Sequence, residues 1–285
     1  MADSNCKPIP EELQAVLLSF EAWLYSNVRL TNSTAALYMG FVRRAYPFLG
    51  LNPSHERILE YIVHLRRTDA ANNSVCATCT ALERFSAFLG RPIQLVRPPK
   101  IKKTIPHTLS EAEVAVFIHA AKDLRQRAIL SLLCYTGMRN KELCNLMVRD
   151  VDIPNNLIRI EVAKFSKERT VNMGGASAIL VEYMMGRSQK PDDLLFVTAR
   201  NGLPLEQQDI RKMVRVTAKR AGFERRIWPH LFRHSLATNL LDRGAHLLTI
   251  KSQLGHAYVE STMVYVERSV KRNINDYNQH MPSYT

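Results

Sequence analysis

The residues best suited to chemistry lie near the C-terminal end of the sequence. His230 and Arg233 form an H-x-x-R pair, His256 follows within Leu-Gly-His, and Tyr265 comes nine residues later. A tyrosine hydroxyl placed beside phosphate-binding groups can attack phosphorus and form a covalent phosphotyrosine. The order and spacing of these four residues therefore indicate chemistry on a phosphodiester, which points to DNA as the substrate.

Such a reaction needs groups that stabilise charge and groups that transfer protons. Arg139 follows the turn Thr136-Gly-Met, and Arg233 is the second candidate arginine. Their planar guanidinium groups donate two hydrogen bonds to a phosphate at once and stay charged at any working pH. His230 and His256 can donate to a phosphate oxygen or accept a proton near neutral pH. The sequence thus supplies a nucleophile, a phosphate clamp and a proton acceptor.

This ordered set resembles the tyrosine recombinase and integrase family, which shares its catalytic core with type IB topoisomerases. The family's T-G-x-R turn matches residues 136–139, its H-x-x-R-H motif matches 230–234, and its L-G-H motif matches 254–256. Its hairpin motif G-K-x-x-K-x-R matches 163–169, except that alanine replaces the glycine. The resemblance covers residues 109 to about 268 by motif.

The resemblance implies a role for each matching residue. Tyr265 attacks the scissile phosphate and stays joined to the 3′ phosphate, which releases a 5′ hydroxyl. The phosphate is held by Arg139, Arg233 and His256. His230 assists proton transfer at the tyrosine.

The same resemblance implies that Lys164 protonates the leaving 5′ oxygen, although Lys167 is a rival for this role and only the family alignment favours Lys164. Glu142, one helical turn beyond Arg139, would support the site without touching the phosphate. The covalent bond conserves the energy of the phosphodiester, so no cofactor is expected, neither a metal nor ATP.

Each of these residues alone has an ordinary structural explanation. An isolated Arg139 is more often a salt-bridged helix residue, and a histidine such as His230 more often packs or caps. A helical tyrosine such as Tyr265 is by default a core residue, and Tyr258 lies nearby. The ordered set, rather than any single member, favours the family assignment.

Composition agrees with a nucleic-acid partner. The chain of 285 residues has a formal net charge of +13, most of it after residue 100, and such an excess favours a polyanionic partner. Its five cysteines are odd in number and lack disulfide or metal-site spacing, which includes the Cys76–Cys79 pair. The sequence shows no secretory signal and no apolar run that spans a bilayer, so we expect a cytoplasmic protein with no membrane partner.

The first ninety residues predict a bundle of four short helices, which by resemblance is the core-binding, DNA-binding domain (1–90). Apolar residues recur at three- and four-residue spacing. The expected helices begin after Pro10, at Asn32 or Ser33 and at Ser54, with the last over about 73–88. Residues 91–107 are rich in proline and basic residues and predict a linker. Lys100, Lys102 and Lys103 in it are candidate DNA-backbone contacts, or simply solvated lysines.

Residues 108–285 predict an α+β catalytic domain within a mainly α-helical protein. Ser110 and Glu113 fit a capping box that opens a long apolar helix through Leu133. Alternating residues 158–162 predict a strand that returns after a turn, which gives a small antiparallel sheet. The remainder from about residue 176 is expected to be mostly helical.

A tail helix is expected over about 269–281, with Val270, Ile274, Tyr277 and Met281 in one apolar stripe. So short a helix needs a surface to dock on. By resemblance it docks into a neighbouring protomer, which would build a homo-tetramer on two DNA sites; the alternative is that it folds back on its own domain.

The sequence therefore favours a site-specific DNA recombinase acting on double-stranded DNA with specific recombination sites. One alternative is a type IB topoisomerase, which shares the chemistry but relaxes DNA. Another is a DNA-binding protein of the same fold that does not cleave. No accessory protein is identified from the sequence.

Overall fold

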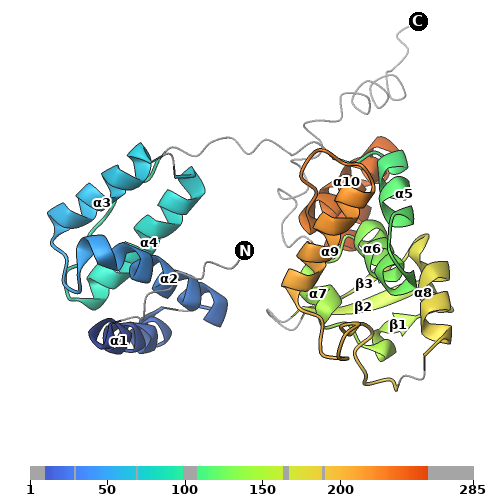
Figure 1. Cartoon of the computed structure of the whole chain (residues 1–285), viewed down its shortest axis with the longest axis horizontal. Coiled ribbons are helices and arrows are strands. Elements are labelled where there is room, and N and C mark those ends of the chain that lie inside the picture. The colour runs from blue at the N-terminus through green and yellow to red at the C-terminus, as the bar shows by residue number, and fades with distance from the viewer. Residues whose placement is uncertain are drawn as a thin grey trace, which may run out of the picture. The chain divides into compact units, whose positions relative to one another are not determined.

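The computed structural model describes residues 10–28, 30–68, 70–98, 108–162, 167–187 and 190–255. The chain divides into two compact units, Met1–Lys103 and Thr104–Thr285 (Figure 1). Each unit has its own hydrophobic core, and we describe each by itself.

The described residues of the N-terminal unit form four helices, as the apolar periodicity predicts. They are α1 (Glu11–Asn27), α2 (Asn32–Leu49), α3 (His55–Arg67) and α4 (Asn72–Phe88). Phe20 of α1 packs edge-on against Phe85 of α4, with ring centroids 5.2 Å apart. Ser54 caps α3, since its side chain accepts a hydrogen bond from the Arg57 amide. The expected cap of α2 at Asn32 or Ser33 is wrong, because the extended residue before this helix is Thr31.

The first eight residues of the expected linker, 91–98, lie against this bundle. Leu95 is buried in the core around α3 and α4, and its amide donates to the Glu83 carboxylate over 2.9 Å. Arg97 pairs with the same carboxylate at 2.5 Å. Lys100, Lys102 and Lys103 lie outside the described residues, so their expected contacts with DNA stay a prediction.

The C-terminal unit surrounds a buried helix with further helices and a small sheet. Helix α6 (Leu124–Thr136) is buried from Ala128 to Cys134 and packs against neighbouring helices and against strand β3 (Figure 1). Its neighbours are α5 (Glu111–His119), α7 (Asn140–Cys144), α8 (Ala176–Met185) and α10 (Pro229–Asp242). The other helices in the described part of this unit are the 3-10 turn η1 (Val148–Asp150), α9 (Gln207–Arg220) and α11 (Leu247–Leu254).

The expected long helix from Ser110 through Leu133 is two helices. The capping box that opens α5 is confirmed, because Ser110 and Glu113 exchange both hydrogen bonds. However, α5 ends at His119, and Asp123 caps a new helix by accepting a hydrogen bond from the Gln126 amide. The local cap outweighs the apolar pattern, which runs through the break without interruption.

The sheet is antiparallel, with strand order β1 (Val151–Asp152), β2 (Leu157–Val162) and β3 (Lys167–Asn172). The predicted β2–β3 hairpin is confirmed, and Ile160 pairs with Arg169 in its register. The two-residue strand β1 was not predicted, since it is too short to show alternation. Lys164 in the hairpin turn and the expected tail helix lie outside the described residues.

Other sequence expectations concern thiols, metals and membranes. Cys76 is half-buried and Cys79 is buried, and both are unpaired thiols. Among the described residues, no cluster of three or more metal-ligating side chains occurs. No helix in the described part of the chain has the length and apolar character needed to cross a bilayer.

Candidate active site

The turn that carries Arg139 depends on its glycine. Helix α6 ends at Thr136, and Gly137 takes a left-handed conformation with φ of 62°. A Cβ atom on Gly137 would lie 2.7 Å from Leu254 Cδ2. The Thr136 hydroxyl accepts a hydrogen bond from the Met138 amide. This turn therefore places Arg139 at the start of α7 and Gly137 against the end of α11.

Arg233 joins three sequence motifs that are far apart along the chain. It is 5% exposed, and its Nη1 donates to the Gly137 carbonyl over 2.8 Å. Its Nη2 donates to the Leu254 carbonyl over 2.5 Å. We call Arg233, Gly137 and Leu254 the Arg233 clasp. The clasp holds the T-G-x-R turn and the residue two places before His256 against the helix of the H-x-x-R motif.

His230 lies one turn before Arg233, as the second residue of α10 after Pro229. Partial burial of its ring lowers its pKa, and the charges of Arg233 and Arg139 lower it further. The pKa of His234 is lowered by burial, then by His230 and Arg233. A pKa below the usual 6.5 leaves His230 neutral at pH 7, so it can accept a proton.

Glu142 accepts two hydrogen bonds from Arg139. Its side chain is 8% exposed. It accepts from the Arg139 amide over 2.7 Å and from Arg139 Nη1 over 2.8 Å. Burial alone would raise the pKa of Glu142, but hydrogen bonds from Arg169 and Arg139 outweigh it and bring the pKa to about 2. The carboxylate is therefore charged at every physiological pH.

Arg169 has no role that the sequence alone predicts. This residue lies on β3 with its side chain 11% exposed, and both its Nη atoms donate to the Glu142 carboxylate, over 2.9 and 2.7 Å. The only signal in the sequence was the arginine that closes the hairpin motif. Its partner stands 27 positions away, so only the fold reveals the pairing.

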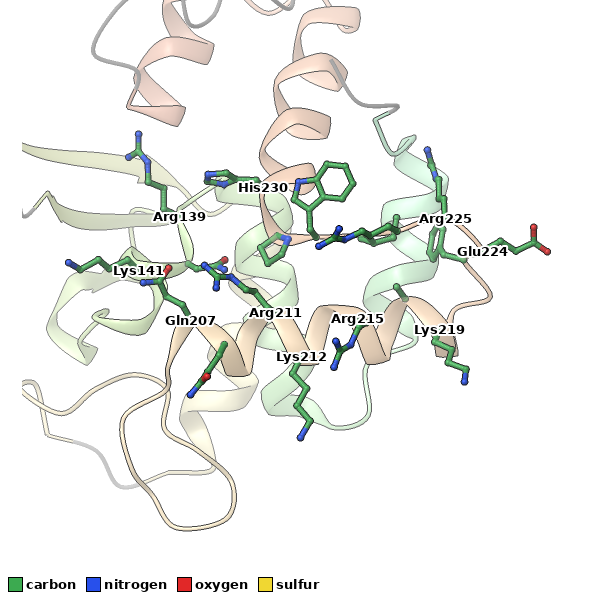
Figure 2. Close-up of a pocket in the computed structure, with 18 residues that line it drawn as sticks. Arg139, Lys141, Gln207, Arg211, Lys212, Arg215, Lys219, Glu224, Arg225 and His230 are labelled. Carbon is green, nitrogen blue, oxygen red and sulfur yellow. The ribbon is translucent and has the colours of Figure 1, made fainter. Parts of the chain in front are cut away.

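A groove of about 1060 Å³ opens beside Arg139 and His230. Figure 2 shows these two residues at one end, Arg225 and Glu224 at the other, and the basic side chains of α9 between them. Among the described residues that line it, eight are basic and one, Glu224, is acidic. The basic residues are Arg139, Lys141, Arg211, Lys212, Arg215, Lys219, Arg225 and Arg226. We call this feature the basic groove.

The amphipathic pattern of α9 accounts for the charge of the basic groove. The helix buries Ile210, Met213 and Val214 in the core. Its basic residues recur on the opposite face, where they line the groove. This spacing is readable in the sequence, but solvated helix faces often carry such charges, so the pattern alone does not indicate a groove. A concave basic surface attracts polyanions by focusing its positive potential.

Of the six residues expected to act on the phosphate, the structure describes three. Arg139, His230 and Arg233 come together at the meeting point of α7 and α10. Lys164, His256 and Tyr265 lie outside the described residues. The site therefore assembles the described arginines and a neutral histidine beside a positively charged groove.

Known proteins show the same fold and related sequences. Residues 107–272 match the phage integrase family. The chain is 33% identical to the tyrosine recombinase XerD of Halalkalibacterium halodurans over 232 residues, which cover 75% of this chain and 77% of that protein. A XerA recombinase crystal structure is 30% identical, covering 95% of this chain and all of its own, with a TM-score of 0.56. The Tn1549 transposon integrase, solved in complex with transposon right end DNA, has 15% identity but a TM-score of 0.73, with coverage of 94% and 99%.

Proposed function

Because the chain belongs to the phage integrase family and is a tyrosine recombinase, a DNA strand transferase, we propose that Tyr265 is the nucleophile of its site-specific recombination reaction. The phenol oxygen attacks the scissile phosphorus as the bond to the 5′ oxygen breaks. The protein is left joined to the 3′ phosphate, and a 5′ hydroxyl is released. Attack by that hydroxyl, or by one from a partner strand, reverses the step and rejoins DNA.

The Arg233 clasp is the observation that carries this proposal. It brings the T-G-x-R turn and the end of α11 onto the H-x-x-R helix. Three of the residues expected at a scissile phosphate, Arg139, His230 and Arg233, thus lie together, although nearly one hundred positions separate the first arginine from the second. Convergence of motifs that are remote in sequence is what an active site requires and what isolated structural arginines do not predict.

The described residues support distinct roles in the reaction. Arg139 keeps 42% of its side chain exposed and lines the basic groove, so its guanidinium is accessible to a phosphate. We assign charge stabilisation to Arg139 and Arg233, together with His256. His230 is neutral and accepts the phenol proton of Tyr265.

Proton transfer to the leaving oxygen completes the balance. We assign it to Lys164 in the β2–β3 turn, with Lys167 as the rival. Neither a metal nor ATP takes part in this scheme, since the phosphotyrosine keeps the energy of the broken bond.

The partner that fits the basic groove is double-stranded DNA that carries specific recombination sites. Its eight basic residues supply phosphate contacts, which position the protein and weaken as salt rises. We assign the N-terminal bundle (1–90) to DNA binding as well, with 91–107 as the linker that follows it. We further propose a homo-tetramer on two DNA sites, assembled through the tail helix at about 269–281.

A suicide substrate tests the proposal. The recombination site is first found by selection from DNA that flanks the gene encoding the protein. DNA nicked beside the cleavage point of that site is then incubated with the protein in the presence of a metal chelator. Wild type and the matched control Tyr258→Phe should form a covalent 3′ adduct, and Tyr265→Phe should form none. An adduct that persists in Tyr265→Phe would refute the assignment of the nucleophile. No wild-type adduct on bound DNA would favour a protein that binds without cleaving.

A further inference from the structure

Arg169 on β3, whose side chain is 11% exposed, contacts both Glu142 of α7 and the end of α11. We propose that Arg169 is a positioning residue for the phosphate clamp, one that holds Arg139 and the end of α11 in their reactive arrangement. This proposal rests on the proposed function, because it concerns the same DNA cleavage step. It adds a residue that acts through Glu142 and the end of α11.

The first support is the carboxylate that Arg169 shares with Arg139. Each carboxylate oxygen of Glu142 accepts one hydrogen bond from each arginine residue, from the amide or Nη1 on one side and from the Nη atoms on the other. Paired bonds from a planar fork fix orientation as well as distance. Arg169 therefore anchors the carboxylate that sets both the backbone and the guanidinium of Arg139.

The second support is the contact between Arg169 and Gly255. A Cβ atom at Gly255 would lie 2.5 Å from Arg169 Cδ and 2.6 Å from its Nε. Gly255 has a left-handed φ of 64°, which ends α11 directly before His256 in the sequence. The stem of Arg169 thus forms the surface on which the end of α11 lies.

A neighbouring contact shows that β3 is the strand that fixes α11. The Gln253 side chain accepts from the Asn172 amide over 3.0 Å and donates to the Asn172 carbonyl over 2.8 Å. The side-chain amide of Gln253 thus bonds to the backbone of β3 in the way that a neighbouring strand would. Gln253 and Arg169 therefore hold the end of α11 on β3 at two points.

The adjacent strand offers a matched control. The side chain of Arg159 on β2 is 48% exposed and approaches Asp150 at 3.6 Å. The two arginines share a hairpin and a charge, but only Arg169 is buried against the clamp. Replacing Arg159 by lysine measures what a simple loss of guanidinium does to the sheet.

Loss of Arg169 should slow cleavage more than it weakens DNA binding. A displacement of reacting groups by about 1 Å costs roughly 10²-fold in rate. We expect Arg169→Met to lose about that factor in suicide-substrate cleavage. Arg169→Lys keeps the charge but not the fork, so it should lose less, about tenfold. Arg159→Lys should match wild type, and all variants should bind DNA with Kd within about twofold.

Two altered substrates distinguish positioning of the clamp from general loss of structure. A methylphosphonate at the scissile position removes a charged oxygen, which reduces the need for guanidinium stabilisation. A sulfur in place of the leaving 5′ oxygen departs without a proton donor. We expect the difference in cleavage rate between Arg169→Lys and wild type to be smaller on methylphosphonate DNA. On the sulfur substrate this difference in rate should be unchanged. Lys164→Ala should show the reverse pattern.

The outcomes separate the two proposals. If wild type forms no adduct, the proposed function fails before Arg169 is considered. If wild type cleaves and Arg169→Lys cleaves equally fast, Arg169 is not a positioning residue. If Arg169→Lys cleaved the sulfur substrate at the wild-type rate, Arg169 would act through the hairpin lysine that protonates the leaving oxygen. That result would overturn the inference. Should Arg169→Met not fold, Arg169→Lys with the two substrates still decides the question.

Discussion

The Arg233 clasp and the basic groove use the same kind of side chain in opposite ways. In the clasp, one buried guanidinium donates to two backbone carbonyls, so its geometry is fixed. In the groove, arginines and lysines of α9 line an open surface and act through their summed charge. The comparison teaches that the buried arginine holds the segments of the site together, whereas the exposed basic residues attract the DNA substrate. The two regions should therefore respond differently to mutation, pH and salt.

Breaking the clasp should have the largest effect on stability. Arg233→Met leaves the carbonyls of Gly137 and Leu254 without their charged donor in a buried place. Hydrogen bonds to charged groups contribute roughly 1.5–3 kcal/mol each, so we expect a loss of about 3–5 kcal/mol in the free energy of unfolding, measured with urea.

The matched change in the groove is Arg215→Ala, which should alter stability by less than about 0.5 kcal/mol. Equal losses of unfolding free energy in the two variants would contradict the distinction between a structural clasp and a groove that attracts DNA.

The second largest effect on stability should come from acid, which weakens the ion pairs of Glu142 with Arg139 and Arg169. The folded pKa of Glu142 lies near 2, below the ordinary 4.5. Its charge therefore contributes stability that is fully present above pH 4.5 and lost as pH falls toward 2. The shift corresponds to about 3 kcal/mol.

Glu142→Gln should be less stable than wild type by roughly this amount at pH 7, and the difference should shrink toward pH 2 in urea titrations. A difference that stays constant over this range would mean that the carboxylate charge is not what holds Arg139.

The groove should control DNA affinity with little effect on folding. Arg211→Ala combined with Arg215→Ala removes two candidate phosphate contacts. Each lost contact lowers the slope of log K against log salt by about 0.9. We expect weaker binding with a shallower slope in fluorescence anisotropy and an unchanged midpoint of urea unfolding. Lys190→Ala, an exposed change outside the groove, is the control and should leave both measurements as in wild type.

Local patterns predicted much of the fold because their causes are local. The helices of the N-terminal unit follow from apolar residues three and four positions apart, and Ser110 opens α5 through a partner three residues away. The break between α5 and α6 was missed because an apolar run on both sides hides the cap at Asp123. The short strand β1 gave no periodic signal at all.

The sequence by itself determined the family, since six residue types suited to the reaction occur in the order and at the spacing of that family's motifs. Which groups build the site was decided by the tertiary structure. Arg233 finds carbonyls at Gly137 and Leu254, and Arg169 finds Glu142, only after distant segments pack. The physical reason is that a residue's type specifies the chemistry of its side chain, whereas the burial and the partners of that side chain depend on contacts made across the folded chain.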